Sequence, residues 1–292
     1  RQALAELAGS AAASDGALQA VLRDADPSVR RAARRSRGTG RMESPAIEIR
    51  TLGGFSVVRG GRSVPESAFG RRKARELLAV LLCARGAVHR EALVEAMWPD
   101  LPPTRGVAAF NSALYALRRT LEPDLSAGQP SSLVVAEGPA YRFVLGPRVR
   151  WDAKEFLRAA SGAVAGDDVA ALRVVERSHG GELLPEWTFS PWTEPLRTEI
   201  AEMHAAALSR LAELLSAAGK TDEAIRRYRI LLAREPDREG WHRALMRIYV
   251  DAGERGLALR QFEQCRTALR EGLGVEPSRA TRDLHAALLK DD

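Results

Sequence analysis

The order of secondary-structure elements predicted for residues 71–145 constrains the fold of this chain more than any other feature. Apolar residues recur at helical spacing in three successive segments, and two short apolar runs around a Gly-Pro turn follow them. The helices are expected at 71–84, 90–98 and 104–121, and the strands at 133–135 and 141–145. Three helices followed by a hairpin are the order of a winged helix-turn-helix, in which Thr104 is the expected N-cap of the third helix.

The region before these helices contains three further segments. Alternating residues around a Gly-Gly pair predict another hairpin, with strands at 46–52 and 54–59. Residues 1–29 are rich in Ala and resemble one unit of a HEAT-like repeat, which cannot bury its own apolar face. Residues 30–41 hold six arginines and no acidic residue. This last segment is either a solvated linker or a basic arm that contacts phosphates.

The second half of the chain is predicted to be entirely helical, and it contains an internal repeat. Ala218-Gly219, followed by Ala224 and Tyr228, is matched 34 residues later by another Ala-Gly pair, Ala258 and Phe262. This is the period of tetratricopeptide repeats, in which small residues allow close helix packing and an aromatic ring fills the gap between helix pairs. The pattern predicts paired helices and does not indicate what they bind.

These segments predict a mainly α fold with a small β component, a winged helix-turn-helix followed by an all-α, tetratricopeptide-like domain. The expected divisions are an upstream helical segment with a basic linker at 1–45, the winged helix at 46–146 and the helical domain at 147–292. Positive charge is concentrated before the helical domain. Residues 46–146 carry 13 basic and 9 acidic side chains, whereas residues 147–292 carry 23 and 24. A polyanion is therefore expected to bind the first half of the chain, while the balanced second half is typical of a protein-binding surface.

The third predicted helix has the two faces that a DNA-reading helix requires. Its apolar stripe consists of Val107, Phe110, Leu114, Leu117 and Leu121, and this stripe must face the core. The opposite side presents the candidate DNA-binding residues Arg105, Asn111, Ser112, Tyr115, Arg118 and Arg119. Arginine suits guanine edges or phosphates, asparagine suits adenine, and tyrosine can donate to a phosphate. An ordinary solvated helix face is the alternative, but the order of elements favours DNA recognition.

Other basic residues are candidates for contacts with the DNA backbone. Arg71, Arg72 and Lys73, together with Arg75, cluster at the start of the first helix, where positive charge opposes the helix dipole. A nearby phosphate would offset that cost, although solvated side chains explain the cluster almost as well. Arg90 begins the second helix in a similar way, and Arg142 lies near the hairpin turn, from which it could enter the minor groove.

The sequence holds no motif that indicates an enzyme, a metal site or a cofactor. It contains no phosphate-binding GxxxxGK loop, no HExxH and no Cys-x-x-Cys. The five histidines are scattered, and Cys83 and Cys265 are expected to be free thiols inside helices of a reduced, cytoplasmic protein. No apolar run approaches the roughly 18 residues needed to span a bilayer, so no membrane partner is expected.

Two groups of motifs resemble a known family. Residues 46–146 resemble an OmpR-type winged helix, and residues 117–121 look like the Leu-Arg-Arg/Lys-x-Leu end of its recognition helix. Residues 151–274 resemble the bacterial transcriptional activator domain of the antibiotic regulatory protein (SARP) family. Its Gly-x-Leu-Leu-Pro, Trp and Glu-x-x-Arg signature is matched by residues 181–185, 192 and 194–197, and its Leu-Gly-x-x-Pro segment by residues 273–277.

The resemblance implies a bacterial transcriptional activator that binds direct repeats in double-stranded DNA near promoters, contacts RNA polymerase and can self-associate on DNA. The family usually has Ser or Thr at the cap of the second helix, where this chain has His89. The motifs at residues 52–55 and 71–75 are also similar to those of large regulators with an upstream NTPase. The chain begins with Arg1 rather than Met, so we expect a C-terminal part of such a regulator.

A second hypothesis comes from a different functional class. Winged helices also serve as docking modules, and tetratricopeptide repeats usually bind peptides, so the chain could be a protein-interaction scaffold that no longer reads DNA. Salt dependence separates the two hypotheses, because a protein that binds phosphates loses affinity steeply as the salt concentration rises.

Overall fold

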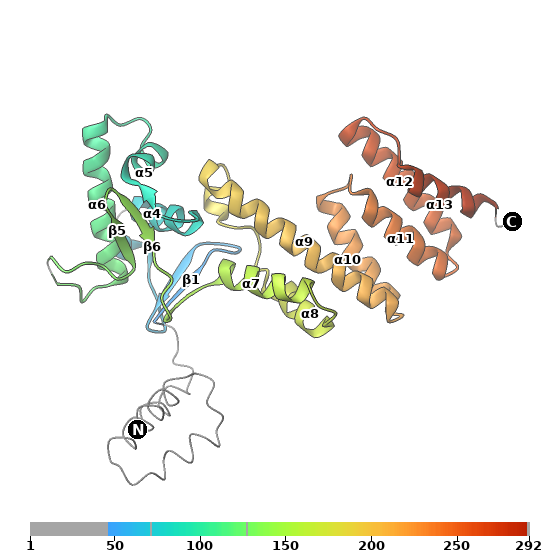
Figure 1. Cartoon of the computed structure of the whole chain (residues 1–292), viewed down its shortest axis with the longest axis horizontal. Helices are drawn as coiled ribbons and strands as arrows, with labels where there is room; N and C mark the ends of the chain where they lie inside the picture. The colour runs from blue at the N-terminus through green and yellow to red at the C-terminus, as the bar shows by residue number, and fades with distance from the viewer. Residues whose placement is uncertain (1–45, 71, 127, 291–292) are drawn as a thin grey trace, which may run out of the picture. The chain divides into compact units, whose positions relative to one another are not determined.

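The computed structural model describes residues 46–290 except residues 71 and 127 (Figure 1). The HEAT-like segment at 1–29, the basic segment at 30–41 and Arg71 lie outside the described residues. Within the described part, the fold is mainly α with two small sheets, as the sequence predicts: a winged helix precedes an all-α region.

The first sheet has the strand order β3-β2-β1-β7 and joins residues that lie far apart in the sequence. Its strands are β1 (Ile47–Arg50), β2 (Ser56–Arg59), β3 (Arg62–Ser63) and β7 (Val149–Trp151). The first three strands pair antiparallel, whereas β7 pairs parallel to β1 from about a hundred residues away. Alternation along the strands places Ile47, Ile49 and Val57 in the core. The predicted hairpin exists, but both strands are shorter than predicted because residues 51–55 form a bend with other partners.

The winged helix contains the three predicted helices and the wing. The helices are α4 (Arg72–Cys83), α5 (Arg90–Met97) and α6 (Pro103–Leu121), and a short 3₁₀ helix, η1 (Glu66–Phe69), precedes them. The wing strands β5 (Val134–Glu137) and β6 (Ala140–Phe143) form a sheet with β4 (Val88–His89), in the order β4-β6-β5. The prediction of Thr104 as the N-cap of α6 is wrong. The helix begins at Pro103 with Pro102 as its N-cap, because a proline at the first helical position has no N–H to leave unsatisfied.

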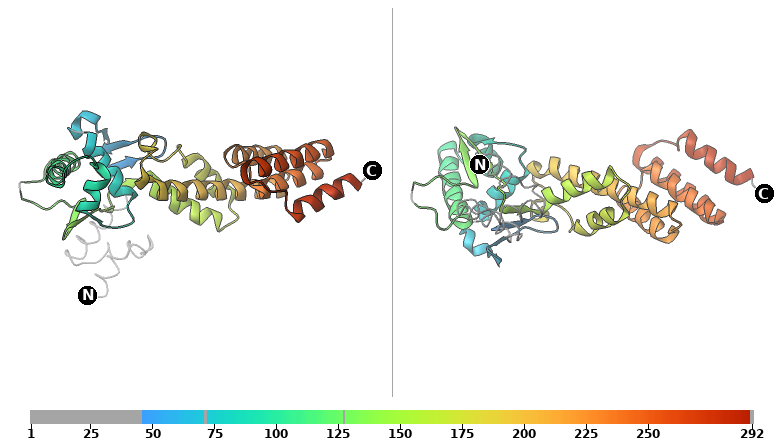
Figure 2. Two further views of the ribbon diagram at one scale, coloured as in Figure 1. Left: turned by 90° about the horizontal axis from the view of Figure 1, so that it is seen from above. Right: turned by 60° about the horizontal axis from the view of Figure 1, so that its bottom comes forward.

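The helical region consists of paired helices that follow one another in chain order (Figures 1 and 2). They are α7 (Asp152–Val164), α8 (Val169–Ser178), α9 (Glu194–Ala217), α10 (Thr221–Arg234), α11 (Glu239–Asp251), α12 (Arg255–Leu273) and α13 (Arg279–Lys290), with η2 (Pro185–Trp187) and η3 (Pro191–Thr193) before α9. The 34-residue repeat relates α9 and α10 to α11 and α12. Ala224 and Ala258 are completely buried, and Tyr228 and Phe262 are buried at equivalent positions, which is the packing that the repeat predicts.

The bend between β1 and β2 is bonded to the segment that carries the Gly-x-Leu-Leu-Pro motif. The N–H of Gly53 donates to the carbonyl of Glu182 at 2.8 Å, and the N–H of Leu184 donates to the carbonyl of Thr51 at 2.8 Å. Gly53 has φ of +81°, and a Cβ at this position would lie 2.4 Å from the carbonyl oxygen of Gly180. The two motifs that resemble the family therefore contact each other, and they join the winged helix and the helical region into one compact unit.

A carboxylate beside this bend reinforces the same connection. Asp152, at the start of α7, accepts hydrogen bonds of 2.9 Å from the N–H and the hydroxyl of Thr51 and one of 3.0 Å from the N–H of Leu52. The indole N–H of Trp151 donates to the Thr51 hydroxyl at 2.9 Å. These bonds satisfy backbone groups that the hairpin itself leaves unpaired, which explains why the bend is ordered although it belongs to neither strand.

Candidate nucleic-acid interface

The inner face of α6 is buried in the core. Phe110 and Leu117 are completely buried, Leu114 and Leu121 are at most 6% exposed, and Val107 packs partly buried against them. Gly106 brings α6 close to α5, because a Cβ there would lie 2.5 Å from Cγ1 of Val94. The stripe predicted from the sequence is confirmed, and it determines which side of α6 faces outward.

The outward face of α6 exposes part of the predicted set. Arg105, Asn111 and Arg119 are exposed, and the side chain of Tyr115 is 70% exposed, which is high for an aromatic residue. Ser112 is half-buried, and its hydroxyl donates to the carbonyl of Ala108 at 3.0 Å. Arg119 donates to the carbonyl of Leu125 at 3.0 Å although the residue is exposed. Arginine, amide and phenol donors thus point away from the protein along one helix.

Arg118 and Arg142 are engaged within the protein. Arg118 is half-buried and donates to the carbonyl of Val134 at 2.8 Å, so it links α6 to the first wing strand. Arg142 forms an ion pair with Glu137 across the wing, which offsets its charge next to the turn. Both side chains therefore hold the wing in place in this structure, a role that the sequence did not reveal.

The basic cluster of the first helix is divided among three environments. Arg72 is exposed. Lys73 forms a 2.9 Å ion pair with Glu76 and donates to the carbonyl of Met97 at 2.6 Å. Arg75 pairs with Glu66, and its guanidinium lies 5.2 Å from the ring centroid of Phe55. Helical geometry explains this division, because adjacent residues on a helix point in directions about 100° apart.

The start of α5 is tied to the wing turn. His89 is the N-cap of α5, and its Nδ1 accepts from the N–H of Glu91 at 3.4 Å. The next N–H, that of Arg90, donates to the carbonyl of Pro139 in the wing turn at 2.9 Å. The Arg90 side chain is half-buried, and its Nε has no hydrogen-bond partner. The ends of α5 and of the wing thus lie together, and the ring of Tyr141 on the wing packs edge-on against Phe110 of α6 at 5.0 Å.

A second carboxylate holds the loop between α6 and the wing. Glu122, directly after α6, accepts hydrogen bonds from the hydroxyls of Ser131 and Ser132 and from the N–H of Ser132. Burial opposes the ionisation of Glu122, but these hydrogen bonds outweigh it and lower its pKa. Sequence reasoning missed this residue because its partners lie nine and ten residues away in a loop without periodicity.

Among the described residues, no group of three or more His, Cys, Asp or Glu side chains is arranged to hold a metal ion. Within the same residues, no helix combines the length and apolar character that crossing a bilayer requires. Cys83 and Cys265 are both free thiols, and burial raises their pKa to about 12 and about 11. Unreactive thiols of this kind belong to helix packing.

Comparisons with known proteins identify the class of this chain. Residues 151–289 match the family model of the bacterial transcriptional activator domain. The chain is 28% identical to the transcriptional regulatory protein MoaR1 of Mycobacterium tuberculosis over 255 residues, which cover 84% of this chain and 80% of the relative. It is 26% identical to the regulatory protein AfsR of Streptomyces coelicolor, covering 86% of this chain but only 25% of that much longer protein.

The fold also matches a solved structure. The structure of Mycobacterium tuberculosis EmbR aligns with a TM-score of 0.72 at 24% identity, over 85% of this chain and 66% of EmbR. A helical region that matches the activator-domain model and follows a winged helix defines a transcriptional regulator. Residues 151–289 belong to the bacterial transcriptional activator domain family, and the similarity of the chain to these regulators supports a SARP-type transcriptional activator.

Proposed function

We propose that this regulator binds double-stranded DNA through α6 and the wing, and that it activates transcription from promoters that carry direct repeats of its site. The observation that carries the proposal is the division of α6 into a fully buried stripe and an exposed face with Arg105, Asn111, Tyr115 and Arg119. A helix of this kind fits the major groove of B-DNA, where such side chains reach base edges and phosphates.

The roles proposed for the side chains follow from their contacts. The guanidinium groups of Arg105 and Arg119 can bind guanine edges or phosphates, and the amide of Asn111 suits an adenine edge. Tyr115 donates to a phosphate. Arg118 and Ser112 already have protein partners and position α6. Arg118 can contact DNA with its remaining N–H donors, and the Ser112 hydroxyl oxygen can accept a hydrogen bond from a base.

The flanking basic residues are proposed as backbone contacts. Arg90 lies next to the wing turn, and its Nε has no partner. Arg72 is exposed, and Arg71 stays a sequence-based proposal. Lys73 and Arg142 are proposed as weaker contacts, because each already has a carboxylate partner that a phosphate would have to displace.

The helical region is proposed to contact RNA polymerase and to support self-association on DNA. Its balanced charge and repeat packing support a protein-binding role. We also propose the division at residues 146 and 147 as the boundary in sequence between the two modules. The pairing of β7 with β1 and the bonds from Asp152 to Thr51 mean that the winged helix needs residues beyond this boundary for its own sheet.

The DNA-binding proposal is tested by fluorescence-anisotropy titration of the full chain against random duplex DNA at two salt concentrations. Affinity is expected to fall steeply as salt rises, because counterions are released from neutralised phosphates. Replacing Arg105 and Arg119 with Ala should weaken binding to random duplex and reduce the salt slope by about one for each phosphate contact that is lost. The matched control replaces Arg226 and Arg247, which are exposed on α10 and α11, and should leave affinity unchanged. Equal affinity of both double variants would rule out α6 as the DNA-reading helix.

A protein-interaction scaffold is the second candidate function. A groove of about 730 Å³ opens beside α12, lined by residues that include Pro236, Thr267 and Ala268, and it supports peptide binding by the repeats. Absence of DNA binding at low salt, together with an intact fold, would favour this candidate.

A further inference from the structure

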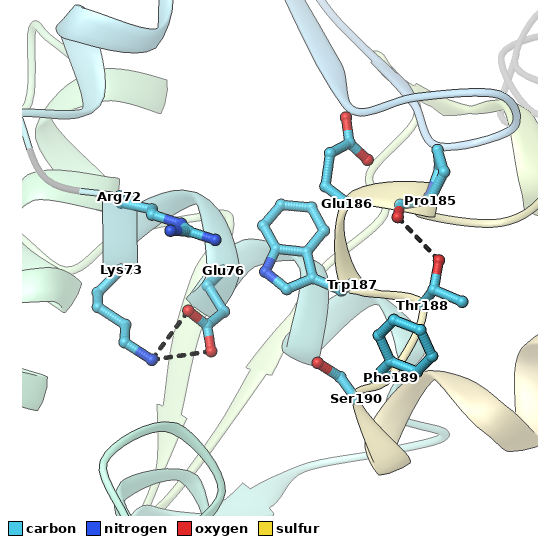
Figure 3. Close-up of a pocket in the computed structure, with 9 residues that line it drawn as sticks. All are labelled: Arg72, Lys73, Glu76, Pro185, Glu186, Trp187, Thr188, Phe189 and Ser190. Atoms are coloured by element: carbon cyan, nitrogen blue, oxygen red, sulfur yellow. Dashed lines mark hydrogen bonds and ion pairs between the residues drawn. The ribbon is translucent and has the colours of Figure 1, made fainter.

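A cavity of about 500 Å³ lies where the start of α4 faces the segment that contains η2 and η3 (Figure 3). Its lining includes Arg72, Lys73, Glu76, Trp187, Phe189 and Ser190. One wall therefore belongs to the winged helix and the other to the helical region. Small-molecule sites occur preferentially at such junctions, so the chemistry of the walls decides what this cavity can hold.

The charged groups of the cavity leave one cation without a partner. Lys73 and Glu76 neutralise each other through their 2.9 Å ion pair. Glu186 accepts from the N–H of Phe55 at 2.7 Å, and Figure 3 shows its carboxylate directed away from Arg72. Arg72 makes no hydrogen bond or ion pair within the described part of the chain, and its guanidinium extends toward Trp187 (Figure 3). A planar guanidinium with free donors is suited to bind a carboxylate through two parallel hydrogen bonds.

Two aromatic residues form the other wall: Trp187 is buried and held in place, and Phe189 is exposed. Trp187 is only 7% exposed, and its ring is held by an edge-on contact with Phe55 at 5.5 Å. Phe189, two residues later, is 99% exposed. Covering an exposed phenyl ring removes apolar surface from water, which favours binding of any ligand that packs against it.

The exposure of Phe189 is imposed by an ordered backbone. The N–H of Ser190 donates to the carbonyl of Trp187 at 3.0 Å. Arg197 donates to the carbonyl of Thr188 at 2.7 Å, and the Thr188 hydroxyl donates to the carbonyl of Pro185 at 2.8 Å. The segment thus presents Phe189 at the edge of the cavity in a defined position, as a binding wall requires.

We propose that this cavity binds a small planar aromatic carboxylate. The carboxylate pairs with the guanidinium of Arg72, and the aromatic ring lies against Trp187 and Phe189. The ligand contacts both walls of the junction, so its occupancy stabilises the arrangement of the winged helix on the helical region. The proposal does not rest on DNA binding, because neither aromatic residue belongs to the DNA-binding face of α6. Arg72 is shared with the proposed backbone contacts, so a bound carboxylate would compete with a phosphate for it.

The experiment uses 2-naphthoate as the probe and measures its binding to the full chain by isothermal titration calorimetry and by saturation-transfer NMR. Binding at a single site is expected, and 2-naphthylmethylammonium, which has the same ring and the opposite charge, should not bind. Arg72→Gln removes the guanidinium and should weaken binding about tenfold or more. Phe189→Ala should weaken it severalfold. Arg226→Gln, an exposed position on α10, is the matched control and should have no effect.

Each outcome decides the proposal. Arg72 and Phe189 are exposed, so both variants should keep the wild-type circular dichroism spectrum and thermal midpoint, which shows that a loss of binding is local. Absence of 2-naphthoate binding at millimolar concentrations would overturn the proposal. Equal binding of the naphthyl cation, or binding that neither variant weakens, would overturn it as well.

Discussion

Replacing Gly53 with Ala should destabilise the chain more than any ordinary turn substitution, because two separate costs act at this position. The first is backbone strain, since φ is +81°, and an L-residue in this region costs about 1–2 kcal/mol. The second is steric. The new Cβ would lie 2.4 Å from the carbonyl oxygen of Gly180, which is backbone and cannot rotate away. Relief of that overlap must lengthen the hydrogen bond from Gly53 to Glu182, whose loss costs about 1 kcal/mol.

The expected total is a decrease of about 2–4 kcal/mol in the free energy of unfolding. It is measured by urea denaturation followed by tryptophan fluorescence, since Trp151 and Trp187 both lie near this contact. Gly60→Ala is the matched control. Gly60 also has positive φ, +55°, but a Cβ there meets nothing within 4 Å, so this variant carries only the strain. A Gly53→Ala variant as stable as Gly60→Ala would refute the argument that the glycine contact joins the two regions.

Two further predictions concern ionisable groups, the buried His204 and the half-buried Glu122. Burial, followed by the charges of His179 and Arg234, lowers the pKa of His204 to about 4, so an NMR titration should find this imidazole neutral at pH 6. Its folded pKa lies below the unfolded value, and stability should therefore fall by about 1–3 kcal/mol as the pH drops from 6.5 toward 4, whereas titration of His204 near pH 6.5 would contradict this. Replacing Glu122 with Ala leaves Ser131 without its acceptor and should speed amide exchange of Val134, with a loss of about 1–3 kcal/mol. Unchanged exchange there would show that Glu122 does not hold the wing loop.

Periodicity in the sequence predicted the elements and their inner faces. The apolar stripe of α6 and the 34-residue repeat of α9 to α12 depend on spacing within one helix or between equivalent helices. Such spacing survives in the fold because a helix turns by a constant angle per residue. The boundaries were less predictable. A proline starts α6 where Thr104 was expected as the cap, and the bend at residues 51–55 shortens both strands of the first hairpin.

The exposure of each candidate side chain, and the partner it bonds to, could not be predicted from the sequence. Arg118 and Arg119 are neighbours of the same type, yet Arg118 is half-buried and bonded to a wing carbonyl while Arg119 is exposed. Lys73 and Arg75 look like one basic cluster with Arg72, but Lys73 pairs with Glu76 of α4 itself and Arg75 pairs with Glu66 of η1. Arg75 and Arg118 reach partners in other segments, and a sequence pattern holds no information about which distant partner a long side chain reaches.

The sequence by itself determined the order of elements, the buried face of each helix, the repeat and the class of regulator. These properties follow from local spacing and from motifs that keep their order along the chain. Only the tertiary structure decided that the bend at Gly53 meets Gly180, that β7 completes the first sheet, and that Arg72 faces Trp187 across a cavity. Each of these contacts joins residues more than a hundred positions apart, and such pairs form only when the packing of both regions brings them together.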